Sequence, residues 1–217
     1  GRLQATADNA ATKIRLTSLV GIRFGAEVWP EEGMGVVFGG EVGMPAQITN
    51  VLGNEVRFTR HRFGTGLTFR HFLGPRPTAA SFFISSRMNA VIEDVQDQQP
   101  VVIVSRFTLS PNLQLGYERF VRGDTTWLRA GLAVGYPFFV RESPSDSGRP
   151  DSMYDARSSV SVCHYLTQRW GLQLGVEHLL QSFEHGGEAT RAGGVNDVSV
   201  FDNFTSVFLT ARYVPTP

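Results

Sequence analysis

Hydrophobic and polar residues alternate with a period of two along most of the chain, as they do in half-buried β-strands. In the stretch 128–136, Leu128, Leu132 and Val134 share one parity, whereas Arg129 and Gly131 share the other. The same alternation recurs in stretches from about residue 13 onwards. No segment shows the sustained three- and four-residue apolar spacing of an amphipathic helix. The pattern therefore predicts an all-β chain.

Turn residues divide the alternating stretches into eight to ten predicted strands. The run Gly74-Pro75-Arg76-Pro77, for example, ends a strand, because proline cannot donate a hydrogen bond to a neighbouring strand. The stretch 101–121 is compatible with one long strand or with two short strands around Pro111. Eight strands and ten strands therefore both agree with the sequence.

Odd-numbered and even-numbered positions of each predicted strand carry different kinds of side chain. One set is rich in large apolar residues and almost free of charge for about ten residues per strand, whereas the other carries glycine, small polar residues, arginine and glutamate. This arrangement is typical of an antiparallel up-and-down transmembrane β-barrel, which is apolar outside against lipid and polar inside. A soluble β-sandwich, in which the apolar parity forms a core, is the alternative.

From this alternation we assign two sets of residues, one to each face of the predicted barrel wall. Those predicted to face lipid are Phe24, Phe38, Leu67, Phe69, Phe82, Ile84, Leu132, Val134, Leu172 and Leu174. Those predicted to form a charge network in the lumen are Arg15, Arg23, Glu27, Glu41, Arg60, Arg62, Arg70, Arg87, Arg106, Glu118, Arg129 and Glu177.

Composition narrows the protein class further. The chain has 23 glycines in 217 residues, about 11% against a usual ~7%, which suits the crowded interior of a narrow barrel. Twenty basic residues balance twenty acidic ones, which argues against a nucleic-acid partner. The single cysteine, Cys163, excludes an internal disulfide and a multi-cysteine metal site. No apolar run approaches the roughly 18 residues of a membrane-spanning helix, so a helical membrane protein is excluded.

Aromatic residues lie mostly near the ends of the predicted strands, and the segments 109–117 and 166–176 look alike, each with a short turn. In these features the chain resembles, over roughly residues 12–214, the small bacterial outer-membrane β-barrels of the OmpA and OmpX type. The resemblance implies residence in the bacterial outer membrane, export with a cleaved signal peptide and insertion by the barrel assembly machinery. It covers a single barrel domain (12–214), which is followed by a tail (215–217). The alanine, threonine, aspartate and asparagine residues of 1–11 indicate a flexible leader.

The predicted lumen charges lead to the functional hypotheses. Eight arginines against four glutamates leave an excess of positive charge. In a barrel of eight strands these side chains fill the interior and pair across it, because an unpaired buried ion costs several kcal/mol. The leading hypothesis is therefore a structural, scaffold or partner-binding component of the outer membrane, for example a subunit of an envelope assembly. A ten-stranded barrel has room for a narrow wet passage, and the alternative is a small, porin-like solute channel that prefers anions.

The sequence shows few other candidate residues for catalysis or ligand binding. Catalytic motifs are missing, so we predict no enzymatic activity, no cofactor and no metal site. A lipid A-modifying outer-membrane hydrolase is a further alternative, with His164, Ser159 or Ser161, and Glu177 as its candidate residues. Outer-membrane lipid is the predicted partner, and the loops at 142–153 and 185–197 are where other envelope proteins would bind.

Overall fold

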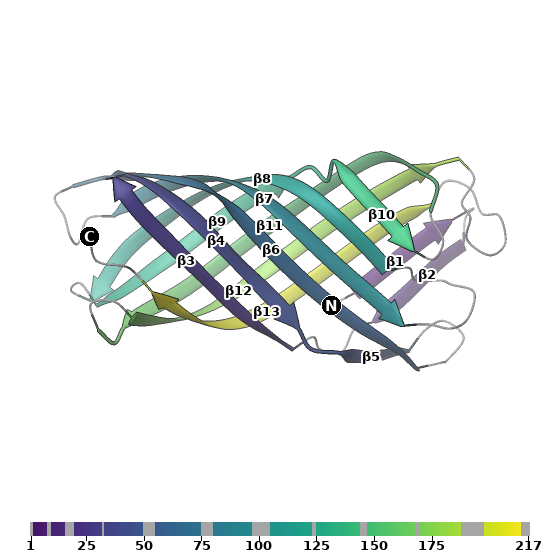
Figure 1. Ribbon diagram of the computed structural model, residues 1–217, viewed down its shortest axis with the longest axis horizontal. Helices are drawn as coiled ribbons and strands as arrows, with labels where there is room; N and C mark the ends of the chain where they lie inside the picture. Colours follow the sequence, from purple (N-terminus) through teal and green to yellow (C-terminus); the bar gives the residue numbers. More distant parts are fainter. Residues whose placement is uncertain are drawn as a thin grey trace.

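The protein is an all-β chain whose strands form one sheet that curls about a long axis (Figure 1). The computed structural model describes residues 2–7, 10–15, 20–31, 33–49, 55–74, 80–96, 105–122, 125–143, 147–167, 170–187 and 198–213. Within these ranges there is no helix, and hence none that is long and apolar enough to cross a membrane. The predicted fold class is confirmed as all-β and antiparallel.

Thirteen strands make up the sheet in the part of the chain that the structure describes. They are β1 (Arg2–Ala7), β2 (Ala10–Arg15), β3 (Gly21–Glu31), β4 (Met34–Gly43), β5 (Ala46–Thr49), β6 (Glu55–Phe72), β7 (Ser81–Gln96), β8 (Ser105–Arg122), β9 (Thr126–Gly135), β10 (Phe139–Ser143), β11 (Arg149–Tyr165), β12 (Trp170–Gly186) and β13 (Ser199–Tyr213). The number exceeds the predicted eight to ten for two reasons. β4 and β5 both pair with β6, one after the other, and are separated at Pro45. β9 and β10 pair with β8 in the same way and are separated at Pro137. Residues 2–15 add a hairpin.

Antiparallel neighbours follow one another in the order β12-β11-β9-β8-β7-β6-β4-β3. β13 pairs antiparallel with β12 along its whole length, from Ser199 opposite Glu184 to Tyr213 opposite Trp170. Its other side pairs with β1 near Ser199 and, in parallel, with β3 at Arg212 and Tyr213. The first and last long strands of the sheet therefore lie beside one another.

The amino-terminal segment and the loops differ from the sequence predictions. The first eleven residues were predicted to be a flexible leader, but β1 occupies 2–7 and pairs with β13, which satisfies its backbone hydrogen bonds. The predicted loop at 142–153 is shorter, because β10 continues to Ser143 and β11 begins at Arg149. In the predicted loop at 185–197, β12 reaches Gly186, and residues 188–197 lie outside the described residues, as does the tail.

The stretch around Pro111 forms one strand rather than a turn. Pro111 lies inside β8, opposite Met88 of β7. On its other side the Pro111 carbonyl accepts a hydrogen bond from the Tyr136 amide, in the interruption between β9 and β10. Because the N–H and C=O of one residue in an antiparallel strand face the same neighbour, the missing N–H of Pro111 points at this irregular segment. Proline is tolerated at such a break in the ladder.

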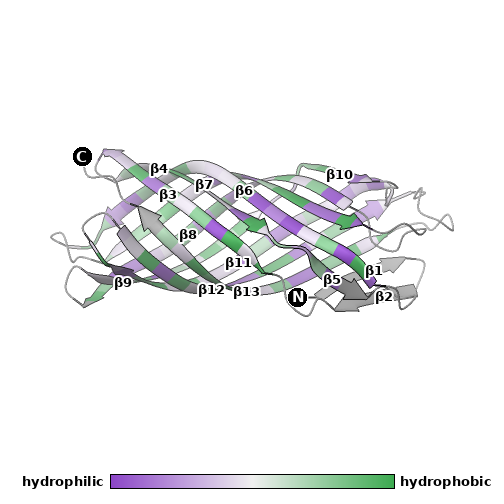
Figure 2. Ribbon diagram, turned by 60° about the horizontal axis from the view of Figure 1, so that its bottom comes forward, coloured by the Kyte–Doolittle hydropathy of each residue, from purple (hydrophilic) through white to green (hydrophobic). Residues whose placement is uncertain are grey.

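The two faces of the curled sheet are chemically opposite. Figure 2 shows hydrophobic and hydrophilic positions alternating along the strands. Apolar side chains dominate the convex face, where Leu132 is 67% exposed and Val207 is 73% exposed. All ten side chains predicted to face lipid are exposed there. The concave face buries charged, polar and small residues, together with an apolar cluster of Met153, Phe183 and Val200 near the end that carries β5 and β10.

Candidate functional site

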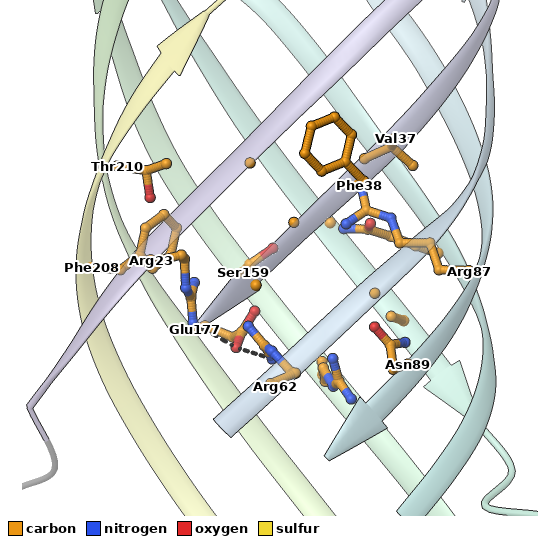
Figure 3. Close-up of a pocket in the computed structure, with 18 of the residues that line it drawn as sticks. Arg23, Val37, Phe38, Arg62, Arg87, Asn89, Ser159, Glu177, Phe208 and Thr210 are labelled. Atoms are coloured by element: carbon orange, nitrogen blue, oxygen red, sulfur yellow. Dashed lines mark hydrogen bonds and ion pairs between the residues drawn. The ribbon is translucent and has the colours of Figure 1, made fainter. Parts of the chain in front are cut away.

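Charged side chains meet one another on the concave face, where Glu177 of β12 is the centre of the first network. Its Oε1 accepts hydrogen bonds from Arg62 Nη1 of β6 at 2.7 Å and from Arg23 Nη2 of β3 at 3.1 Å (Figure 3). Arg23 Nη2 also donates to Glu41 Oε2 of β4 at 2.6 Å. β6 and β12 are well separated in the strand order, so this contact requires the sheet to curl strongly.

A second network links β3, β6, β8 and β9. Arg129 Nη1 donates to Glu27 Oε1 at 2.6 Å, and its Nε lies 3.2 Å from Glu118 Oε1. Arg70 Nη2 lies 2.9 Å from Glu118 Oε2. Each carboxylate therefore serves two guanidinium groups, because Arg70 also approaches Glu27 at 3.9 Å.

A third network lies nearer the end of the sheet that carries β5 and β10. Arg106 Nη1 of β8 donates to the fully buried Asp202 Oδ2 of β13 at 2.9 Å. Arg60 Nε donates to Glu93 Oε1 at 3.1 Å. Arg106 also lies within 3.6 Å of Glu142, so the acidic groups of three further strands converge on it and on Arg60.

Arginine side chains of these networks also lie against aromatic rings. Arg23 lies 4.2 Å from the ring centre of Phe208, and Arg129 lies 4.1 Å from that of Phe83. A guanidinium group can stack on a ring and form planar hydrogen bonds to a carboxylate at the same time, which an ammonium group cannot do. This double use gives a physical reason for arginine rather than lysine at these positions of the concave face.

The structure brings together all the predicted lumen residues whose side chains it describes. Eleven of the twelve lie on the concave face, and the side chain of Arg15 lies outside the described part of the chain. Of these, Arg87 of β7 is the one without an ion pair to a described carboxylate.

Five charged residues of the described concave face were not predicted from the sequence. They are Glu93, Glu142, Asp155, Arg157 and Asp202. Four of the five are acidic, so the predicted excess of positive charge is wrong: among the described residues the arginines of this face are matched by as many carboxylates. Glu142 lies in the predicted loop 142–153, and Asp155 and Arg157 lie just beyond it, whereas extending the alternation by a few residues from Arg87 finds Glu93.

A cavity of about 200 Å³ opens between the first two networks. Its wall includes glycines from four strands, Gly25, Gly39, Gly64 and Gly131. Amide and hydroxyl groups alternate with charged groups around it, and Figure 3 shows the Arg87 and Asn89 side chains beside this space. The volume holds several water molecules.

The candidate hydrolase residues do not meet. His164 is exposed on the convex face, where its Nδ1 lies 2.9 Å from Thr126 Oγ1. Ser161 is buried on the opposite face and accepts a hydrogen bond from Gln173 Nε2 at 2.8 Å, while Glu177 is held by arginines. Cys163 is fully buried. The described residues contain no group of three or more His, Cys, Asp or Glu side chains that could hold a metal.

Comparison with known proteins adds no relative, because no family model and no curated protein sequence matches the chain.

Proposed function

We propose that the curled sheet closes into a β-barrel that spans the bacterial outer membrane, and that the protein serves there as a structural or partner-binding component rather than as a conduit. The observation that carries the proposal is the inversion of the two faces. Ion pairs fill the inside, and large apolar side chains cover the outside. A soluble protein rarely exposes so extensive an apolar surface, whereas a barrel in lipid requires one.

The height of the apolar surface supports a membrane location. On β7, the convex-face positions from Phe82 to Ile92 are apolar or small, and on β8 so are those from Phe107 to Tyr117. Each stretch is eleven residues long, and a tilted transmembrane strand needs about 9–11. Polar or charged residues follow on the same face at Asp94 and Arg119.

The interior supports a filled barrel over an anion-conducting one. Arginines and carboxylates of the described concave face are equal in number, and each of these arginines except Arg87 lies within 4 Å of a carboxylate, so the passage as a whole carries little net charge to select anions for conduction. The apolar cluster of Met153, Phe183, Val198 and Val200, with Val140 packed against it, covers neighbouring strands of the concave face near one end and adds to the filling of the interior there. Loops near this end are the place for partner contacts.

Heat-modifiability on a semi-native gel tests the barrel. The protein, refolded in detergent, is expected to migrate at one position unheated and at another after boiling, because a closed barrel resists the detergent of the gel until it is heated. An unheated sample that runs with the boiled one, or a chain that stays soluble and folded without detergent, would refute the membrane barrel.

Planar bilayers test the filled interior separately. Folded protein that passes the gel assay is expected to give no steady conductance steps above the bare bilayer. Steady, anion-selective steps would instead establish the channel alternative and overturn the structural role.

A further inference from the structure

We propose that the internal cavity is a binding site for one small oxyanion of the size of phosphate or sulfate, held by Arg87 of β7 and Arg157 of β11. The inference rests on the proposed barrel, because the cavity lies in its interior. It adds a ligand to a protein that the networks alone would make purely structural.

Among the described arginines of the concave face, Arg87 has no ion pair to a carboxylate and Arg157 has only a long one. Arg87 Nε is buried and makes no hydrogen bond. Arg157 has two buried nitrogens, Nε and Nη2, without a hydrogen bond, and its side chain is 10% exposed. Its contact with Asp155 Oδ2, at 3.8 Å, is too long for a hydrogen bond. That oxygen already accepts a hydrogen bond from Ser110 Oγ at 2.7 Å.

The carboxylates of the cavity wall already form ion pairs with other arginines. Five arginines and two glutamates line the cavity, and the glutamates are Glu27 and Glu177. Each of them contacts two arginines other than Arg87 and Arg157. Glu41 and Glu118 pair with the same arginines from behind the wall. Arg87 therefore has no described carboxylate within ion-pair distance, and Arg157 has Asp155 alone, at 3.8 Å.

Burying a guanidinium group without an acceptor costs several kcal/mol, and a bound anion removes this cost. Guanidinium groups form paired, planar hydrogen bonds to the oxygens of phosphate, sulfate or carboxylate. Amide groups of Asn89 and Gln114 line the same cavity and supply further donors. The space of about 200 Å³ accommodates one tetrahedral oxyanion with water around it.

Isothermal titration calorimetry with inorganic phosphate and with sulfate tests the site, on protein refolded in a phosphate-free, uncharged detergent. Heat-modifiability is measured first on the same samples, so that a failed barrel is recognised before any conclusion about the anion. Wild-type protein is expected to bind one anion per chain in a saturable manner. Chloride at equal ionic strength is expected to give a weaker signal.

Variants locate the site. Arg87→Gln and Arg157→Gln are each expected to lower the association constant at least tenfold. Arg57→Gln, which removes an exposed arginine from β6, is expected to leave it unchanged. Folded wild-type protein that shows no saturable binding overturns the proposal, whatever the variants do. Equal loss in Arg57→Gln and Arg87→Gln overturns it too, because the signal would then come from surface charge.

Discussion

Single charged residues on the concave face depend on partners from distant strands, and Glu177 shows this most clearly. It joins β12 to β3 and β6 through Arg23 and Arg62, and its side chain is only 16% exposed. Removing it leaves two guanidinium groups in a largely buried site. Uncompensated buried charge is more costly than the intact pair is favourable, so removing Glu177 is expected to weaken the contact of β12 with β3 and β6.

The substitution Glu177→Gln is therefore expected to be strongly destabilising. We expect a loss near the lower end of the roughly 3–5 kcal/mol that breaking a buried ion pair costs, because some solvent reaches the site. Urea unfolding of the refolded protein measures the loss. The matched control is Glu184→Gln, on the same strand but exposed, which is expected to change stability by no more than about 0.5 kcal/mol. Equal effects of the two substitutions would contradict the role of the network.

Charged substitutions on the convex face test whether its residues meet lipid. In the proposed barrel, Leu132→Arg places a charge against lipid near the middle of β9 and is expected to cost roughly 2–4 kcal/mol in vesicles. Leu73→Arg, at a residue that is 54% exposed but lies beyond the end of β6, is expected to cost about 0–1 kcal/mol. Unfolding in phospholipid vesicles compares the two. A Leu132→Arg protein as stable as Leu73→Arg would show that this part of the convex face does not meet lipid.

At the scale of the element, close contact between neighbouring strands explains individual glycines. A methyl group added at Gly116 of β8 would collide with the ring of Phe83 of β7, which is buried. A methyl group at Gly131 of β9 would meet Gln114 Nε2 at 2.8 Å, the far end of a flexible side chain that can move away. The two glycines thus occupy the same sheet but tolerate very different changes.

Gly116→Ala is expected to destabilise the protein by about 1–3 kcal/mol, as overpacking does in other interiors, and Gly131→Ala by clearly less. The double variant Gly116→Ala/Phe83→Leu is expected to recover part of the loss, because the smaller side chain makes room. The unfolding midpoints of the wild type, Gly116→Ala, Phe83→Leu and the double variant complete the cycle. A Gly116→Ala protein as stable as the wild type would contradict the observed contact.

The interiors of the long strands were predictable from sequence, but their ends were not. In β6, β7, β9 and β12 the alternation is regular, and the strands lie where it places them. The strand ends were not predicted because charged residues there were interpreted as loop. Asp155 and Glu142 sit in or beside the predicted loop 142–153, although both point inward to arginines.

The candidate site could be predicted only in part for the same reason. Parity assigns a face to Arg23 or Glu177, but it cannot tell which strands lie across from each other in a curled sheet. Arg106 meets Asp202 although 96 residues separate them in sequence. Tertiary partners of this kind decide whether a buried charge is compensated, and hence whether Arg87 and Arg157 are free to bind a ligand.

At the scale of the whole molecule, the two faces of the sheet are inverted relative to those of a soluble protein. The apolar surface faces outward, the charges face inward and compensate one another, and β13 joins the two ends of the strand order. These features together favour lipid as the surroundings, since burying the apolar face against lipid removes the cost of exposing it to water.

A nitroxide scan along β11 tests this claim most directly. In a Cys163→Ala background, single cysteines at positions 158 to 162 are spin-labelled, and the protein is reconstituted in vesicles. Labels at Val160 and Val162 are expected to be accessible to oxygen and protected from a water-soluble nickel chelate, whereas labels at Ser159 and Ser161 are expected to have low accessibility to oxygen. Accessibility to the nickel chelate at Val160 and Val162 would contradict the account, because these side chains would then face water.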